Sequence, residues 1–249
     1  MTEFDVLQKA TVEGNVVKLP QGQLDRKLYE QVAKKLNGIG GKWKGGKTSG
    51  FIFTGDPTDL LKQICGGTNI NLKKDYQYFP TPIQIANHMM HLIMVNPEHR
   101  ILEPSAGQGA LIESLLKNYP KIDVTSIDCV EMMPQNRDIL AKKGYRIVAD
   151  NFLEYKPGEV YDVIIANPPF TKNQDIDHIQ HMYKCLKPGG TLISIASTHW
   201  KFAKNTKETQ FRDWIRQLRA KVEDMEAGEF KISGTMTPTC IIRIIKQAA

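Results

Sequence analysis

The sequence predicts an α/β protein whose mostly parallel sheet has helices on both faces and an antiparallel strand near the C-terminus. Three observations predict this. From about residue 80, strand-like and helix-like stretches alternate, which implies a mostly parallel sheet. Two strand-like stretches then follow one another near the end of the chain. Residues 1–75 show a different pattern, so we expect a small α+β N-terminal region before a larger domain over 76–249.

In the N-terminal region, apolar residues recur every four positions and predict an amphipathic helix over 22–37. They are Leu24, Leu28, Val32 and Leu36. Glycines at 38, 40 and 41 end this helix and begin a glycine- and lysine-rich loop. A short strand at 51–53 and a helix near DPTDLLKQI (56–64) follow, and GGTNINLKKD (66–75) is the expected linker.

The larger domain is expected to follow the order strand, helix, strand, helix. We expect strands at 101–103, 124–131, 146–149, 161–166, 191–197, 221–226 and 239–245, and helices at 109–118, 134–143, 174–186 (ending in KPGG) and 207–219. Ligands of such sheets bind at the carboxyl ends of the strands. The ends of the strands at 101–103 and 161–166 are therefore candidate site positions.

Composition limits the class of protein. The chain has 249 residues, of which 41% are hydrophobic and 24% charged, as in soluble globular proteins. No apolar run is long enough for a membrane span, and no secretory signal is visible. Cys65, Cys129, Cys185 and Cys240 are isolated, so we expect neither disulfides nor a metal site, in a reducing cytoplasm.

Positive charge gathers in the N-terminal region. The net charge is +6, and residues 34–55 hold five lysines and no acidic residue. One interpretation is a solvated loop. The other is a nucleic-acid contact in which Lys42, Lys44 and Lys47 bind phosphates and Trp43 stacks on a base.

Two stretches suit a nucleotide-like ligand. EPSAGQG follows the strand at 101–103, and Gly107 and Gly109 allow a tight turn, although an ordinary strand-to-helix turn would look the same. Position 112 is Ile, so a dinucleotide fingerprint is incomplete. Glu103 would repel a pyrophosphate but would suit a cationic amine. Glu131, 22 residues after Gly109, is placed to accept from ribose hydroxyls, or is a surface glutamate.

Asp150, Asn151 and Phe152 follow the strand at 146–149 and offer an acceptor for an exocyclic amine and an aromatic edge. The alternative is a solvated loop with one core Phe. A cationic amino-acid part, a ribose and an adenine together make up S-adenosylmethionine, which is the expected cofactor.

Asn167-Pro168-Pro169-Phe170 ends the apolar strand at 161–166. The prolines remove two backbone donors and keep Asn167 out of the helical conformation. The result is an ordinary stiff turn, or a pair of acceptors held rigidly in front of a planar ring.

The chain resembles the S-adenosylmethionine-dependent DNA methyltransferases that methylate amino groups. FPTP (79–82) resembles their (F/Y)xTP motif, EPSAGQG their glycine motif and NPPF their (D/N/S)PP(Y/F) motif, in the order of the gamma-class adenine-N6 enzymes. NPPFTKNQDIDHI and the terminal FKISGTMTPTCIIRI are similar to the small phage-type members. The resemblance covers about 79–249.

The resemblance implies a Rossmann-like methyltransferase sheet, DNA as substrate and a bacterial or phage-infected cytoplasm. Its implied cofactor-binding residues are Phe79, Thr81, Pro82, Glu103, Pro104, Ser105, Ala106, Gly107, Gly109, Glu131, Met132, Asp150, Asn151 and Phe152. The implied catalytic residues are Asn167, Pro168, Pro169 and Phe170.

The implied mechanism uses the Asn167 side-chain oxygen and the Pro168 carbonyl as acceptors for the two hydrogens of an adenine amine. Phe170 would stack on the base, which must be flipped out of a duplex or taken from a single strand.

The chain departs from the family pattern in two ways. Asn151 separates Asp150 from Phe152, so either polar residue could face the cofactor adenine, and we favour Asp150. The chain also lacks room for a large C-terminal recognition domain. We therefore expect low sequence specificity, or specificity supplied by the basic N-terminal region, a specificity subunit or a second copy of the chain.

Three other functions stay open. NPPF also suits a methyltransferase for a protein glutamine or for RNA, because each of these substrates presents an NH2 group. A nucleic-acid-binding subunit without activity is the third alternative.

Overall fold

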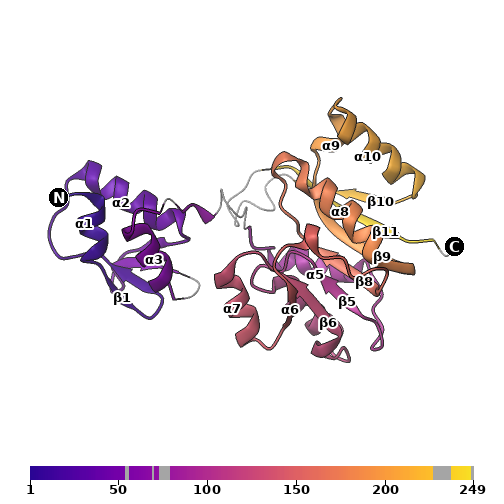
Figure 1. Cartoon of the computed structure of the whole chain (residues 1–249), viewed down its shortest axis with the longest axis horizontal. Helices are drawn as coiled ribbons and strands as arrows, with labels where there is room; N and C mark the ends of the chain where they lie inside the picture. The colour runs from indigo at the N-terminus through magenta and orange to yellow at the C-terminus, as the bar shows by residue number, and fades with distance from the viewer. Residues whose placement is uncertain (54–55, 69, 73–78, 227–236, 248–249) are drawn as a thin grey trace. The chain divides into compact units, whose positions relative to one another are not determined.

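The computed structural model describes residues 1–53, 56–68, 70–72, 79–226 and 237–247. The chain divides into two compact units, Met1–Tyr78 and Phe79–Ala249 (Figure 1). Part of the expected linker (69 and 73–75) and the start of FKISGTMTPTCIIRI (230–236) lie outside the described residues.

The first unit contains a four-stranded antiparallel sheet in the order β1-β2-β4-β3. Its strands are β1 (Thr11–Glu13), β2 (Val16–Lys18), β3 (Lys42–Lys44) and β4 (Gly50–Ile52), and its helices are α1 (Glu3–Gln8), α2 (Arg26–Gly38) and α3 (Thr58–Cys65). The sequence pattern did not reveal α1, β1 or β2. The expectation of a loop through the lysine-rich stretch was wrong in part, because β3 forms there by pairing with β4.

Helix α2 begins later than its apolar spacing predicted. The Asp25 carboxylate accepts from the backbone amides of Lys27 and Leu28 and so sets the start. Leu24 lies before this cap. Val32 and Leu36, on the inner face of the helix, are fully buried.

The second unit contains a seven-stranded sheet in the order β10-β11-β9-β8-β5-β6-β7. Its strands are β5 (Ile101–Glu103), β6 (Ile127–Val130), β7 (Arg146–Ala149), β8 (Tyr161–Ala166), β9 (Leu186–Ser197), β10 (Lys221–Asp224) and β11 (Thr239–Ile245). Strands β5 to β9 pair in parallel, and β11 runs antiparallel to both β9 and β10. The predicted α/β fold is confirmed.

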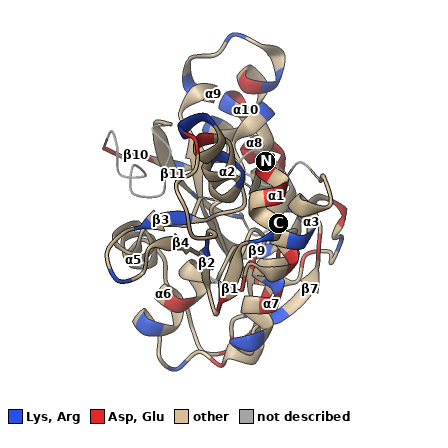
Figure 2. Ribbon diagram, turned by 90° about the vertical axis from the view of Figure 1, so that its left-hand side faces the viewer, with Lys and Arg blue, Asp and Glu red and all other residues tan. Residues whose placement is uncertain are grey.

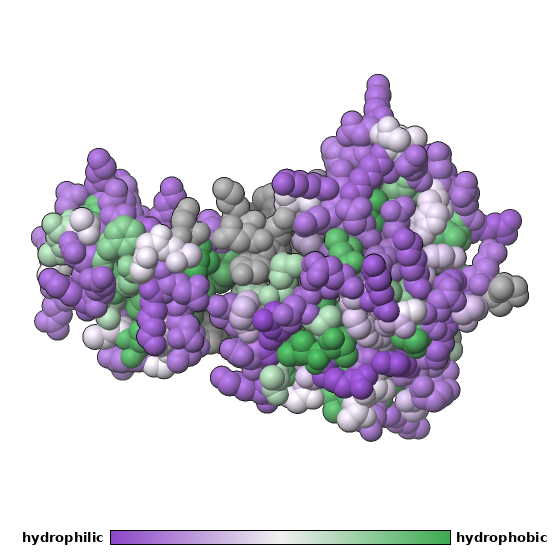
Figure 3. Space-filling model, viewed as in Figure 1, coloured by the Kyte–Doolittle hydropathy of each residue, from purple (hydrophilic) through white to green (hydrophobic). Residues whose placement is uncertain are grey.

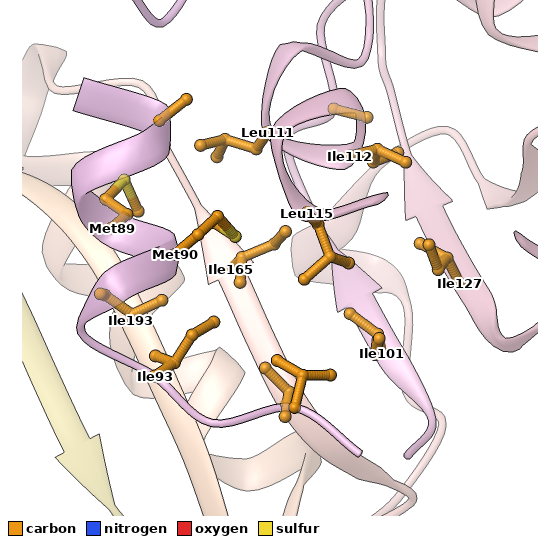
Figure 4. Close-up of a cluster of buried hydrophobic side chains, with 14 of the residues drawn as sticks. Met89, Met90, Ile93, Ile101, Leu111, Ile112, Leu115, Ile127, Ile165 and Ile193 are labelled. Carbon is orange, nitrogen blue, oxygen red and sulfur yellow. The ribbon is translucent and has the colours of Figure 1, made fainter. Parts of the chain in front are cut away.

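Helices cover both faces of this sheet. They are α5 (Ile83–His91), α6 (Ala110–Asn118), α7 (Pro134–Lys142), α8 (Gln174–Cys185), α9 (His199–Phe202) and α10 (Thr206–Gln217), with 3₁₀ turns η1 (Val124–Ser126), η2 (Phe152–Glu154) and η3 (Thr171–Asn173). Ile165 packs with Met90 and Leu115 of α5 and α6 on one face (Figure 4). Its neighbour Ile164 packs with α8 and α10 on the other, as strand alternation requires.

Other predicted boundaries also differ from the structure. Strand β9 begins at Leu186 and includes the KPGG stretch that was expected to end a helix. The register shifts between Tyr161 and Val163, and Gly189 takes φ +81°, so the stretch bulges within the strand. The strand expected at 124–131 opens as the 3₁₀ turn η1, because Asp123 accepts from the Thr125 amide. Helix α5 was not predicted.

Hydrophilic residues cover most of the face seen in Figure 3, and hydrophobic residues reach it in small groups. Within the described part of the chain, no helix is both long and apolar enough to cross a membrane.

Candidate active site

The candidate site lies where three neighbouring parallel strands end. Glu103 is the last residue of β5, Glu131 follows β6 and Asn167 follows β8. Strand β5 pairs with both β6 and β8, so these three residues leave the sheet at one edge. The structure thus brings together the glycine stretch, the expected ribose-binding acid and NPPF.

The turn after β5 depends on its glycines. Gly107 and Gly109 have φ angles of +55° and +90°, which residues with a side chain rarely adopt. A Cβ on Gly109 would also lie 2.8 Å from the Tyr145 ring. The Lys143 amine donates to the Gln108 carbonyl (2.7 Å) and supports the turn from α7.

The Glu131 carboxylate is held by two backbone amides. One oxygen accepts from Gly107 (2.7 Å) and the other from Met133 (2.7 Å). Each oxygen retains a lone pair, so the group can still accept from two hydroxyls. Burial raises the pKa of Glu131, while the two amides and Arg137 oppose that rise.

Glu103 is a buried carboxylate with unused acceptor capacity. The residue is 2% exposed, and among the described residues its Oε2 has no hydrogen-bond partner. Burial, followed by the charge of Glu131, raises its pKa well above the usual range, although the Ile112 amide donates to the carboxylate. The Ser105 hydroxyl is also buried, and no group in the described part of the chain hydrogen-bonds to it. A cationic amine would supply the missing donor and favour the ionised form of Glu103.

The two polar residues in the loop after β7, Asp150 and Asn151, have different surroundings. Asn151 caps η2 by accepting from Leu153 (3.1 Å) and donates to Glu154 (2.7 Å). Asp150 is the more open of the two, with a side chain 68% exposed and 3.3 Å from the Arg137 guanidinium. This arrangement favours Asp150 over Asn151 as a ligand-facing acceptor, while both remain predictions.

Phe152 is 2% exposed and packs against the rings of His178 and His181. The structure therefore places it in the core rather than in an open pocket. Met132, in contrast, is 51% exposed beside Glu131. Arg137 was not identified from the sequence: it donates to the Glu131 and Met132 carbonyls and pairs with Asp150. Only the fold brings these groups to one guanidinium.

Asn167 is oriented by the FPTP segment. Its Nδ2 donates to the Phe79 carbonyl (3.3 Å) and to the Thr81 hydroxyl (3.0 Å). A carbonyl can only accept, so the nitrogen must lie on this side and the Asn167 oxygen on the other. The structure thus joins FPTP and NPPF. Pro168 is buried, and Phe170 packs partly against the core.

Two successive left-handed residues follow NPPF. Lys172 and Asn173 take φ +56° and +59°, which are uncommon for residues other than glycine. The Asn173 amide donates to Glu208 of α10 (2.8 Å). Asp175 then accepts from the amide (2.9 Å) and hydroxyl (2.8 Å) of Ser197, at the end of β9. These anchors were also missed, since nothing in the sequence marks them.

In the first unit, the structure separates the aromatic and basic residues of the lysine-rich stretch. Lys42 and Lys44 occupy alternate positions of β3 and share one face of the sheet. Trp43 lies on the other face, with its ring centroid 5.2 Å from Phe51 and 6.3 Å from Tyr29. Lys47 is exposed in the following turn. Phosphate contact by the lysines and stacking by Trp43 would therefore use different faces.

A known protein family matches most of the second unit, and curated proteins resemble part of this chain. Residues 85–231 match the family described as methyltransferase small domain. A release factor glutamine methyltransferase of Koribacter versatilis is 26% identical over 35% of this chain and 33% of its own length. The type II methyltransferase M.HincII of Haemophilus influenzae is 30% identical over 42% of this chain and 19% of its own.

A solved structure shares the fold. The methyltransferase subunit of a type I restriction-modification system from Streptococcus thermophilus superposes with a TM-score of 0.57 at 16% identity, over 68% of this chain and 45% of that one. The chain spans about a third of the length of the first curated relatives it matches.

Proposed function

We propose, from the premise that the chain belongs to the methyltransferase small domain family, that it methylates the N6 amine of adenine in DNA. The chain is an S-adenosylmethionine-dependent methyltransferase with the Rossmann-like fold of that class. The proposal concerns the acceptor of the methyl group. One observation carries it: the side chain of Asn167 is oriented by Phe79 and Thr81.

The orientation of Asn167 suits an NH2 substrate. The amine of adenine is a weak nucleophile because its lone pair is delocalised into the ring. Two acceptors, the Asn167 oxygen and the Pro168 carbonyl, would bind its two hydrogens and favour the geometry that frees the lone pair. Because the prolines and the FPTP contacts hold these acceptors in advance, little reorganisation is needed during the reaction.

The residues at the ends of β5 and β6 fit the cofactor. The buried Oε2 of Glu103, to which no described residue donates, would pair with the cationic amine of the cofactor. Glu131 would accept from the ribose hydroxyls, and Asp150 would accept from the adenine amine. The bound cofactor supplies a methyl group on a sulfonium, which needs no further activation.

DNA as the substrate is supported by the likeness to M.HincII and by the exposed lysines of the first unit. We propose that sequence specificity is low, or that it comes from that unit, from a specificity subunit or from a second copy of the chain. The likeness to a release factor glutamine methyltransferase favours a second candidate, a protein glutamine, whose side chain also ends in NH2.

Product analysis distinguishes these substrates. Purified protein would be incubated with tritiated S-adenosylmethionine and, separately, with duplex DNA, single-stranded DNA, RNA or a protein extract. After digestion, we expect N6-methyladenine from DNA. Label in RNA or in a glutamine residue would keep the cofactor chemistry and overturn the DNA assignment. Absence of label despite bound cofactor would favour a non-catalytic binding subunit.

A further inference from the structure

An exposed aromatic side chain lies on the short helix α9. Phe202 is 79% exposed, although Trp200, two residues earlier, is buried at 4%. We call residues 198–207 (THWKFAKNTK) the α9–α10 corner. A single exposed Phe is common on protein surfaces and indicates nothing by itself.

The α9–α10 corner is fixed beside NPPF. It begins directly after β9, whose last residue Ser197 is bound by Asp175 of α8. One oxygen of the buried Glu208 accepts from Asn173, in the loop after NPPF, and from Asn205, in the corner (3.1 Å). Figure 1 shows α9 and α10 beside α8. Two side chains therefore connect the corner to the loop that leaves the catalytic motif.

Lysines flank Phe202 in the corner, at positions 201, 204 and 207. Two lysines near it already have partners: Lys201 pairs with Asp224, and Lys207 pairs with Asp177. Lys204 in the corner and Lys172 in the loop after NPPF are exposed, and within the described residues neither has an acidic partner. Figure 2 shows the basic residues on α9 and α10 among the acidic ones. The two unpaired lysines thus directly precede Asn173 and Asn205, the residues that Glu208 joins.

We propose that the α9–α10 corner binds the DNA strand that carries the target base, and this rests on the proposed function. Phe202 stacks on a base next to the target, and Lys204 and Lys172 contact the flanking phosphates. Stacking on an aromatic ring holds a base irrespective of its identity, as expected for an enzyme of low sequence specificity. The corner thus supplies the second unit with a substrate contact of its own.

Binding measurements test the proposal without requiring turnover. The affinity of the full-length protein for a fluorescent single-stranded oligonucleotide would be measured by anisotropy, with S-adenosylhomocysteine in place of the methyl donor. We expect Phe202→Ala to weaken binding by about five- to a hundredfold and Phe202→Trp to retain it. Lys204→Gln should reduce the slope of log affinity against log salt by about 0.7.

Two matched variants serve as controls. Met94, 83% exposed, and the exposed Lys121 lie in loops that lead into β5 and β6, at the opposite edge of the sheet. Met94→Ala and Lys121→Gln should leave DNA affinity and salt slope unchanged. Cofactor affinity should stay at the wild-type level in all variants.

The outcomes separate the two proposals. If the wild type methylates DNA but Phe202→Ala binds DNA as tightly as the wild type, the corner proposal is overturned and the proposed function stands. Loss of cofactor binding in Phe202→Ala would show a structural effect and also overturn the corner proposal. If the wild type neither binds nor methylates DNA, the proposed function fails and the corner proposal fails with it.

Discussion

The two halves of the candidate site are built in different ways. At β5 and β6, Glu103 is buried and Glu131 is partly buried, and backbone amides donate to both carboxylates, that of Ile112 to Glu103 and those of Gly107 and Met133 to Glu131. At β8, the side chain of Asn167 is held by a segment that precedes it by 86 residues. The carboxylates of the cofactor half are thus held by backbone amides at most 24 residues away, whereas the acceptor half depends on a contact across a much longer stretch of the chain. Substitutions should therefore damage the two halves separately.

The largest effect is expected from Asn167→Ala. The change removes one of the two acceptors for the amine, and loss of one preorganised hydrogen-bonding group typically lowers kcat by about 10²–10³-fold. Cofactor affinity should stay within about twofold, since Asn167 contacts neither Glu103 nor Glu131 in the structure. Single-turnover methylation and calorimetric cofactor binding would measure both. Wild-type turnover would overturn the assignment of NPPF.

The matching change in the cofactor half is Glu131→Gln. The new amide nitrogen would face a backbone N–H of Gly107 or Met133, and a charged acceptor would be lost. Hydrogen bonds to charged groups contribute roughly 1.5–3 kcal/mol each, so we expect cofactor affinity to fall by about 10–100-fold. Turnover at saturating cofactor should change little. Glu98→Gln, at an exposed site, is the control, and equal affinity of the two variants would contradict the ribose assignment.

Glu103→Gln should change the pH dependence of cofactor binding. Burial keeps Glu103 protonated above its ordinary pKa of 4.5, and a cationic ligand favours the ionised form. Binding should therefore release a proton, and affinity should rise as the pH increases from 4.5 towards the raised pKa, by up to about tenfold for each pKa unit. Calorimetric titration with the cofactor in two buffers of different ionisation enthalpy measures the number of protons released on binding.

The same group affects folding stability. The pKa of Glu103 is higher in the folded than in the unfolded protein. Its contribution to the free energy of unfolding is therefore largest below pH 4.5 and is lost as the pH rises through the raised pKa. The Glu103→Gln variant should lack this decline and release no proton on binding. Equal proton release by both proteins would contradict the assignment of the amine to Glu103.

The smallest effect is expected from Thr81→Val. The substitution removes one of the two acceptors for the Asn167 nitrogen but leaves the Phe79 carbonyl. A neutral hydrogen bond contributes about 0.5–1.5 kcal/mol, so kcat should fall by roughly two- to tenfold. Thr81→Ser retains the hydroxyl and should restore the rate. If Thr81→Val lowers cofactor affinity and leaves kcat unchanged, Thr81 contacts the cofactor rather than orienting Asn167.

Sequence alone determined the parts of this protein that follow from local pattern. The strands Arg146–Ala149, Tyr161–Ala166 and Thr239–Ile245 have the predicted bounds, because short apolar runs between polar turns have few other ways to be buried. The α/β class and the cofactor also followed from the alternating elements and the motifs. The glycine turn was predictable because positive φ at Gly107 and Gly109 is a local requirement.

Tertiary structure decided what depends on distant partners. The orientation of Asn167, the anchoring of Asn173 by Glu208 and the three contacts of Arg137 join groups whose spacing in the chain carries no periodic pattern. Likewise, β3 pairs with β4 in the folded unit, and the alternation of a strand places Lys42 and Trp43 on opposite faces. Local sequence specifies which hydrogen-bonding groups are present, but which of them meet is decided by how the strands and helices pack.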